Sequence, residues 1–208
     1  MFLLGSIVFG LLTLELFAGG PLLAWDTSLA KALPAIVSSS PAYVLTIMNI
    51  GFYLGEYVLV GLLALLVVYF IAKRSWTELA MTVLGPVGST ALFLWLSNLI
   101  GRSRPPTQIG ISTTIPGFPS GHSIAVVVVY GLTAYLLVPA MRTKWGKALV
   151  IAGAVLLMLF VGATRVFTAG HYLTDVVAGY AVGIAWSGVI YTAIELLSGK
   201  WRRTHGTG

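Results

Sequence analysis

The sequence predicts an all-α integral membrane protein built as a bundle of six transmembrane helices, and three observations support this prediction. Among 208 residues only 12 are Lys or Arg and 6 are Asp or Glu, so 9% are charged, whereas soluble domains carry about 25%. Hydrophobic residues make up 58%, more than a soluble domain of this size can keep from water. The apolar runs are long and continuous, which excludes an outer-membrane barrel, and the low charge excludes a disordered chain.

The charged residues divide the chain into apolar segments whose lengths can be compared with the membrane. A transmembrane helix needs about 20 apolar residues to cross the hydrocarbon core. The segments of suitable length comprise residues 1–14 with their continuation, 57–72, 79–101, 123–141, 148–164 and 176–194. They are hydrophobic around the whole helix circumference, as lipid-facing helices are. The sequence therefore predicts six spans.

The first span is expected to end near Leu23, after several glycines and Pro21. Residues 24–43 carry Trp25, charged residues and two prolines, and we interpret them as an interfacial connection with a short amphipathic piece. No basic segment precedes the first span and no small-residue cleavage site follows it, so we expect it to remain as an anchor. Residues 1–208 are then expected to form a single membrane-embedded domain.

Basic residues near span ends favour the cytoplasmic side of a membrane. With the N-terminus inside, the inner connections hold eight basic residues and the outer ones hold four, so we predict that both termini are cytoplasmic. The inner set is Lys73, Arg74, Arg142, Lys144, Lys147, Lys200, Arg202 and Arg203, and the outer set is Lys31, Arg102, Arg104 and Arg165. The net charge of +6 is scattered between apolar segments, which favours membrane topology over nucleic-acid binding.

Three polar segments, residues 101–106, 119–123 and 164–175, lie on the outer face by this topology. In the second, Pro119 and Ser120 precede an apolar run as at a helix start, where unpaired N–H groups and the helix dipole attract an anion such as phosphate. His122 falls in the first turn of this helix, where an imidazole can donate or accept a proton. A histidine that only caps the helix or packs at the interface is the alternative.

The third segment holds His171 and Asp175, four residues apart. On a helix they share one face, so the carboxylate can hold one imidazole nitrogen and leave the other free to attack. Arg104 and Arg165 offer the forked donors that suit phosphate oxygens. The competing interpretations are a local helix contact for the His–Asp pair and arginines that extend to the lipid headgroups. Charged groups at the edge of a membrane span favour the functional interpretation.

These residues resemble the three-part pattern of the type 2 phosphatidic acid phosphatase (PAP2) family. The family pattern reads K-x6-R-P, then P-S-G-H, then S-R-x5-H-x3-D. The chain has Arg104-Pro105, the complete residues 119–122, and Arg165, His171 and Asp175 at the family spacing. The resemblance covers residues 97–175, and the short six-helix chain is similar to bacterial members of the phosphatidylglycerophosphatase B type.

The resemblance implies a metal-independent lipid phosphatase of the bacterial inner membrane whose active site faces outward. It implies that His171 attacks phosphorus, that Asp175 steadies its imidazolium, and that His122 protonates the departing lipid oxygen. The groups implied to hold the phosphate oxygens are Arg104, Arg165 and the backbone N–H groups of Ser120 and Gly121. A phosphohistidine intermediate is implied, with no metal and no cofactor. Consistently, the chain has no cysteine and no outer carboxylate cluster for a metal.

The chain departs from the family pattern at two positions. Ser97 stands where the family has lysine, and Thr164 replaces a serine but keeps the hydroxyl. The absence of the lysine removes a positive charge from the phosphate site. Three consequences are open: Arg102 takes over the role of the lysine, Ser97 donates a weaker hydrogen bond, or the activity is lowered. Arg102 is the first candidate for this compensation.

The implied substrate is a membrane phospholipid or a polyprenyl pyrophosphate. Phosphatidylglycerophosphate is favoured, and undecaprenyl pyrophosphate is the alternative; both present a terminal phosphate. No nucleic acid and no obligate protein partner are expected. An inactive lipid-binding relative and a vanadate-using haloperoxidase are two rival interpretations of the same residues. A transporter is disfavoured because its polar groups would lie near the bilayer midplane.

Two carboxylates, Glu15 and Glu56, fall inside or next to expected spans. Carboxylates inside a membrane span often have a function. Two possible functions here are lining a path for lipid and pairing with Arg102. Because the sequence names no partner for them, we interpret both as protonated or hydrogen-bonded packing contacts. The pairs Gly51/Gly55 and Gly179/Gly183 are spaced for close helix approach, which we expect within the monomer.

Overall fold

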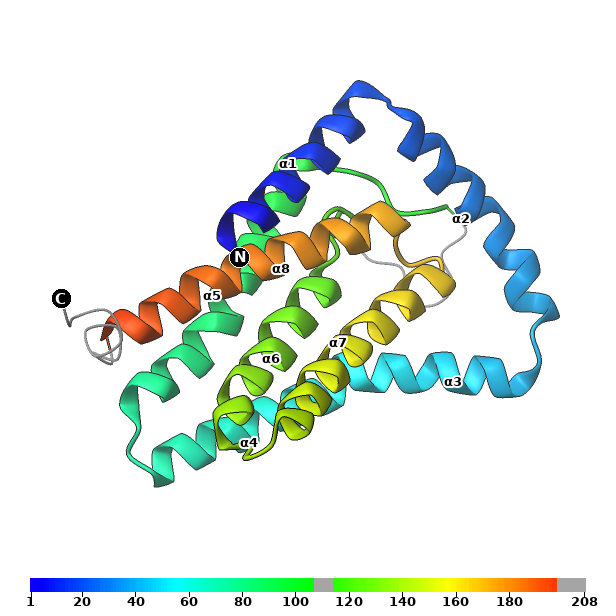
Figure 1. The fold of residues 1–208 in the computed structure, drawn as a ribbon. Coiled ribbons are helices and arrows are strands. Elements are labelled where there is room, and N and C mark those ends of the chain that lie inside the picture. The colour runs from blue at the N-terminus through cyan, green and yellow to red at the C-terminus, as the bar shows by residue number, and fades with distance from the viewer. Residues whose placement is uncertain (107–113, 198–208) are drawn as a thin grey trace.

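The computed structural model describes residues 1–106 and 114–197, and it is helical without strands in those ranges. Most of the chain lies in long helices (Figure 1). In chain order they are α1 (Phe2–Ala18), α2 (Pro21–Ser39), α3 (Ala42–Tyr53), the π-helical turn η1 (Leu54–Val58), α4 (Leu59–Ala72), α5 (Trp76–Ile100), α6 (Gly121–Leu137), the short 3-10 helix η2 (Val138–Ala140), α7 (Lys144–Phe167) and α8 (Leu173–Leu197). The predicted all-α class is confirmed.

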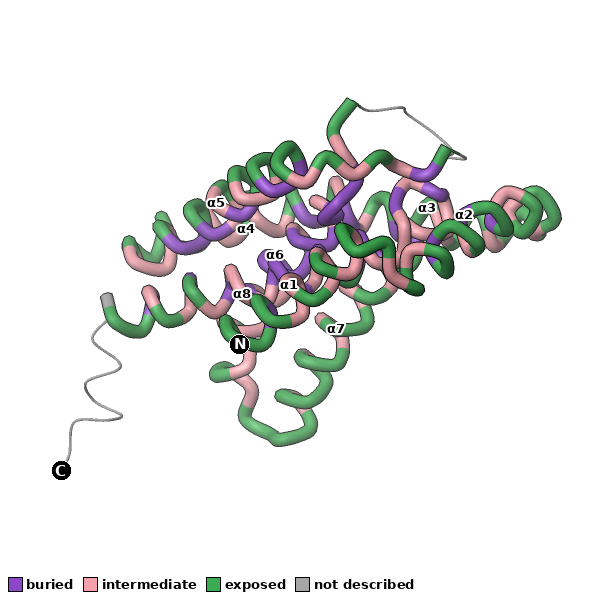
Figure 2. The backbone as a smooth tube through the Cα atoms, turned by 90° about the horizontal axis from the view of Figure 1, so that it is seen from above, coloured by how far each residue is buried: buried purple, intermediate pink, exposed green. Residues whose placement is uncertain are grey.

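Five helical segments of the described chain are long and apolar enough to cross a membrane. They are Ala42–Ala72, Trp76–Ile100, Gly121–Ala140, Lys144–Phe167 and Leu173–Leu196. A sixth span results if α1 and α2, which meet at an angle of 82°, are counted as one broken span. Helix α6 lies at the centre, packed against α5, α7 and α8, and its buried residues stand out in Figure 2.

The first predicted span differs from the structure. Helix α1 ends at Ala18 because Gly19 adopts the left-handed conformation (φ 65°), and Pro21 occupies the first turn of α2. The Glu15 carboxylate accepts the N–H of Leu22 (2.8 Å) and so caps the new helix. Residues 24–43, expected as an interfacial connection, lie mostly in the 19-residue helix α2. The hydrogen-bonded contact expected for Glu15 is thus the cap of α2.

The second span starts earlier than predicted. Its helix runs from Ala42 to Ala72, and the π-helical turn that contains Glu56 interrupts it without ending it. The charge of Glu56 set the predicted boundary at residue 57. The helix continues through this position, and Glu56 has a partner on α6, described below.

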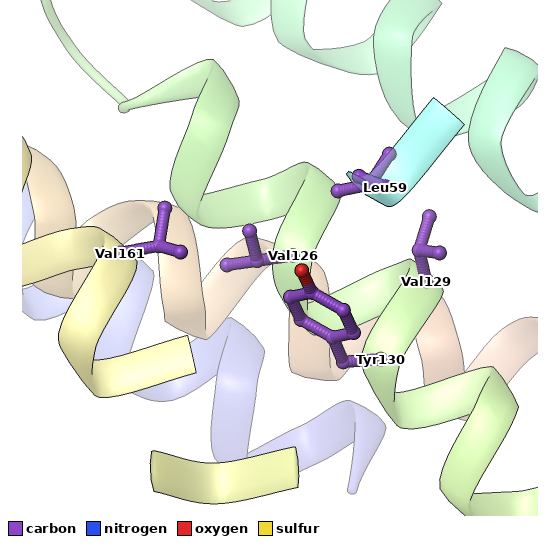
Figure 3. Close-up of a cluster of buried hydrophobic side chains, with 5 residues drawn as sticks. All are labelled: Leu59, Val126, Val129, Tyr130 and Val161. Atoms are coloured by element: carbon purple, nitrogen blue, oxygen red, sulfur yellow. The ribbon is translucent and has the colours of Figure 1, made fainter. Parts of the chain in front are cut away.

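The hydrophobic cluster in Figure 3 joins α4, α6 and α7. Its members are Leu59, Val126, Val129, Tyr130 and Val161. The hydroxyl of Tyr130 donates to the carbonyl oxygen of Leu54 (2.7 Å), at the start of the π-helical turn. A buried hydroxyl is costly unless it is paired, so this bond fixes the turn against α6.

Both glycine pairs lie at helix contacts within the monomer, as predicted. A Cβ at Gly51 would overlap Cγ2 of Thr164, so α3 approaches α7 closely there. A Cβ at Gly179 would lie 2.6 Å from the carbonyl oxygen of Ser120. Helix α8 therefore packs directly on the residue that begins α6.

Candidate active site

The three polar segments expected on one face of the membrane are adjacent in the structure. The N–H of Ser120 donates to the carbonyl oxygen of Asp175 (2.9 Å), which joins the start of α6 to the start of α8. Nη1 of Arg104 donates to the carbonyl oxygen of Gly170 (2.9 Å), which joins the α5–α6 connection to the segment before α8. Residues from all three segments thus border one polar site.

His171 is held in a defined tautomer. Its Nδ1 lies 2.8 Å from the carbonyl oxygen of Gly117, which can only accept a hydrogen bond, so Nδ1 is the protonated nitrogen. Nε2 lies 3.0 Å from Nη1 of Arg104, which can only donate, so Nε2 carries the lone pair. The residue is 2% exposed. Nε2 is therefore an oriented lone pair that faces the guanidinium of Arg104.

Burial lowers the pKa of His171 below its ordinary value of 6.5. The carboxylate of Asp175 opposes this shift, and the positive charges of Arg104 and His122 add to it. The imidazole is therefore neutral at neutral pH, as a nucleophile must be. Burial also lowers the pKa of Arg104, and Asp175 counteracts that effect; a guanidinium stays charged nonetheless.

Asp175 and His171 do not share a helix face, because α8 begins at Leu173 and His171 precedes it. Oδ2 of Asp175 lies 3.6 Å from Nδ1 of His171 and accepts the N–H of Tyr172 (2.9 Å). An acidic side chain in the first helical turn that bonds back to the preceding N–H is half of a capping box. The turn before α8, rather than helical spacing, brings the carboxylate to the imidazole.

Arg102 lies beside the site, and its guanidinium is engaged by two buried carboxylates. Nη1 donates to Oδ1 of Asp175 (2.5 Å) and Nη2 donates to Oδ2 of Asp26 (2.9 Å). The guanidinium also lies over the Tyr172 ring, 4.1 Å from its centroid. The side chains of Asp26 and Asp175 are 1% and 0% exposed. In the structure Arg102 thus contacts the carboxylate that faces His171.

Asp26 on α2 is a site residue that the sequence did not indicate. Its carboxylate also accepts the N–H of Thr174 (3.2 Å) and the hydroxyl of the same residue. A negative charge at the first turn of α8 is favourable to the helix dipole. Asp26 belongs to no motif and lies 76 residues before Arg102, so only the fold reveals the contact.

Replacing Asp26 with Asn is expected to lower both activity and stability, because Arg102 loses one of its two carboxylates. A hydrogen bond to a charged group contributes about 1.5–3 kcal/mol, so we expect a lower thermal midpoint and a turnover reduced about tenfold. Thermal unfolding and phosphate release on the same preparation measure both. Asp26→Glu keeps the charge and should retain more activity. An Asn variant with the parent's midpoint and rate would refute this role.

Arg165 and the start of α6 provide donors that fit an anion. Arg165 is 8% exposed, and its Nε is buried without a hydrogen-bond partner among the described residues. Its guanidinium lies 5.0 Å from the ring centroid of Phe52. The N–H of Ser120 is already bonded, whereas the N–H of Gly121, at the first position of α6, has no acceptor within the helix. Of these two backbone donors, Gly121 is the one available to phosphate.

The two residues that depart from the family pattern use their hydroxyls within their own helices. Ser97 is fully buried and donates to the carbonyl oxygen of Leu94 (3.2 Å). Thr164 donates to the carbonyl oxygen of Val161 (2.7 Å). In this structure, the hydroxyl of Ser97 therefore bonds to helix α5.

His122 lies in the first turn of α6, as predicted, and its partner is Glu56. Nε2 of His122 and Oε1 of Glu56 form a hydrogen bond from the start of α6 to the π-helical turn. Glu56 was expected to be a protonated or hydrogen-bonded packing contact, and the structure identifies His122 as its hydrogen-bond partner. The two residues are 66 positions apart, so sequence spacing gave no signal of the pair.

Comparisons with known proteins place the chain in a family and a fold. The family described as the PAP2 superfamily matches residues 57–197. Phosphatidylglycerophosphatase B of Bacillus subtilis (strain 168) is 31% identical over 119 residues, or 55% of this chain and 57% of the relative, so the match spans little more than half of that protein. The crystal structure of a transmembrane PAP2-type phosphatidylglycerolphosphate phosphatase from Bacillus subtilis superposes with a TM-score of 0.80 at 25% identity, covering 92% of this chain and 94% of that one. The chain is a multi-pass membrane protein that belongs to the PAP2 superfamily.

Proposed function

We propose that this protein is a membrane lipid phosphatase that removes the terminal phosphate of phosphatidylglycerophosphate and leaves phosphatidylglycerol. The observation that carries the proposal is the lone pair on Nε2 of neutral His171, directed at the guanidinium of Arg104. Membership of the PAP2 superfamily supports a phosphatase. The similarity to a phosphatidylglycerophosphatase supports the choice of lipid.

In the proposed first step, Nε2 of His171 attacks phosphorus in line with the departing lipid oxygen. The N–P bond forms as the P–O bond breaks, and His122 gives its proton to the lipid oxygen, which leaves as an alcohol. The N–H at Nδ1 keeps its hydrogen bond to the carbonyl oxygen of Gly117, and the nearby carboxylate of Asp175 stabilises the positively charged ring. Water then attacks phosphorus: the new P–O bond forms as the N–P bond breaks, neutral His122 takes the proton of the water, and phosphate and His171 are released.

The phosphoryl charge in the transition state is spread over three equatorial oxygens. Arg104, Arg165 and the N–H of Gly121 are the proposed donors to them, since preorganised donors give the largest stabilisation of such charge. Arg102 keeps Asp175 in place. No metal takes part in this proposal; no three His, Asp or Glu side chains of residues 1–106 and 114–197 are grouped to hold one.

Undecaprenyl pyrophosphate is the second candidate substrate. All of the donors proposed above act on a terminal phosphoryl group, which both lipids carry. Helix α5 exposes apolar side chains such as Leu99 and Leu94, and such surfaces accept acyl and isoprenyl chains alike. We further propose that the site faces outward from a bacterial cell membrane, with both termini cytoplasmic, because eight of the twelve basic residues then lie inside.

The test is phosphate release by the detergent-solubilised protein with EDTA present, with the two lipids offered separately. Release from phosphatidylglycerophosphate at the higher kcat/KM supports the proposal, and a higher value for undecaprenyl pyrophosphate selects the second candidate. No release from either lipid would leave an inactive binding relative, and Ser97→Lys would then test whether the missing lysine is the cause. Loss of activity in EDTA, restored by a divalent ion, would contradict the metal-free mechanism.

The pKa of His171 gives the proposal a pH dependence. The nucleophile must be neutral, and burial holds its pKa below 6.5. Activity is therefore retained as pH falls through 6.5 and is lost only when the pH falls through the lowered pKa. We expect the acidic limb of log kcat/KM against pH to have its midpoint below 6.5. A midpoint above that value would contradict a buried neutral nucleophile.

A further inference from the structure

We propose that Glu56 is the positioning residue of the proton donor: its carboxylate holds Nε2–H of His122, so that Nδ1 of the same ring faces the departing lipid oxygen. This inference rests on the proposed function. It assigns to the site a second histidine–carboxylate pair, alongside His171 and Asp175, and the two pairs come from different helices.

The contact itself is the first support. Nε2 of His122 and Oε1 of Glu56 are hydrogen-bonded, and both side chains are only partly exposed, at 32% and 41%. An ionised carboxylate can accept a hydrogen bond but cannot donate one, so the proton of this hydrogen bond is on Nε2. Nδ1 is then the remaining nitrogen of the ring. A carboxylate that orients an imidazole in this way also stabilises the protonated ring, which is the form that donates to the leaving group.

The backbone that carries Glu56 is the second support. Glu56 lies in the π-helical turn Leu54–Val58, and such turns inside α-helices occur frequently at functional sites. The turn is held on two sides: Tyr130 of α6 donates to the carbonyl oxygen of Leu54 (2.7 Å), and Gly55 packs on α7, where a Cβ would lie 2.8 Å from Cγ1 of Val161. The carboxylate is therefore carried by a fixed segment.

The charges around the pair are the third support. Arg165 on α7 is close enough to interact electrostatically with Glu56, and the charge of His122 acts on His171 before α8. Glu56 is thus a negative group bonded to His122 and within electrostatic reach of the buried Arg165.

The test compares Glu56→Gln with the parent in phosphate release across pH. The amide can still accept a hydrogen bond but lacks the charge, so we expect kcat on the phospholipid to fall about 10- to 100-fold and the alkaline limb of the profile to move to lower pH. Glu56→Asp should recover part of the rate. Glu15→Gln is the matched control, because its amide oxygen can still cap α2 at Leu22, and it should leave the profile unchanged.

A double-mutant cycle decides whether Glu56 acts through His122. In the His122→Ala background, Glu56→Gln should cause no further loss of kcat on the phospholipid. An equal loss in both backgrounds, or an unchanged alkaline limb in Glu56→Gln, would overturn the proposal. A parent that releases no phosphate would instead refute the proposed function.

If Glu56→Gln does not fold, the parent itself provides the test. In ¹⁵N NMR of the imidazole nitrogens, assigned with His122→Ala, neutral His122 should carry its proton on Nε2. A proton on Nδ1 would overturn the proposal.

Discussion

Replacing His171 with alanine is expected to abolish phosphate release, by more than about 10⁴-fold. The side chain supplies the Nε2 lone pair, and no other described group is held against Arg104 in the same way. The loss should appear in kcat with phosphatidylglycerophosphate and with undecaprenyl pyrophosphate, because both require the same covalent step. The rates are measured on protein whose thermal midpoint matches that of the parent.

The chain offers a matched control for this variant. His205 is the third histidine of the sequence and lies outside the described residues. His205→Ala removes the same side chain at a position that belongs to none of the three polar segments, and it should retain the parent's rate. A folded His171→Ala enzyme that still releases phosphate would show that another group is the nucleophile.

Replacing His122 with alanine is expected to lower kcat on a phospholipid about 10²–10⁴-fold, the usual contribution of a general acid. The lipid alkoxide is a poor leaving group and needs the proton. The p-nitrophenolate of the aryl ester p-nitrophenyl phosphate leaves without a proton, so its release in the first turnover should be nearly unaffected. The comparison is made by stopped-flow absorbance on the same preparation.

The leaving group therefore separates two explanations of a slow His122→Ala enzyme. A defect in protonation of the leaving group slows the reaction of the phospholipid only. A defect in phosphate binding or folding slows the aryl ester by the same factor, and that result would contradict the assignment of His122 as the proton donor.

The sequence predicted the parts of this molecule that depend on local pattern. The residues Pro119 to His122 begin a helix because the N-cap and the apolar run that follows are local signals, and the structure starts α6 there. The continuous apolar runs located the spans for the same reason, although the span Ala42–Ala72 begins before its predicted start at residue 57. Arg104, His122 and His171 come from three segments, and the topology was sufficient to place them on one face.

The parts that the sequence did not predict depend on long-range contacts. Charge positions failed to mark the span boundary at Glu56 because a carboxylate can lie inside a span when it has a partner. That partner, His122, lies 66 residues away. Asp26 was assigned to a connection, although it is buried against Arg102, 76 residues later. The break between α1 and α2 follows from the conformation of Gly19, which composition does not reveal.

The central claim is that His171 carries phosphate during turnover, and trapping that phosphate tests it most directly. His122→Ala with p-nitrophenyl phosphate should form the intermediate and hydrolyse it slowly, because the second step lacks its base. The reaction is quenched in alkali, where phosphohistidine survives, and the peptides are sequenced by mass spectrometry. The account predicts phosphate on His171 in amounts matching the burst of nitrophenolate. Turnover with His171 unmodified, or phosphate on another residue, would contradict it.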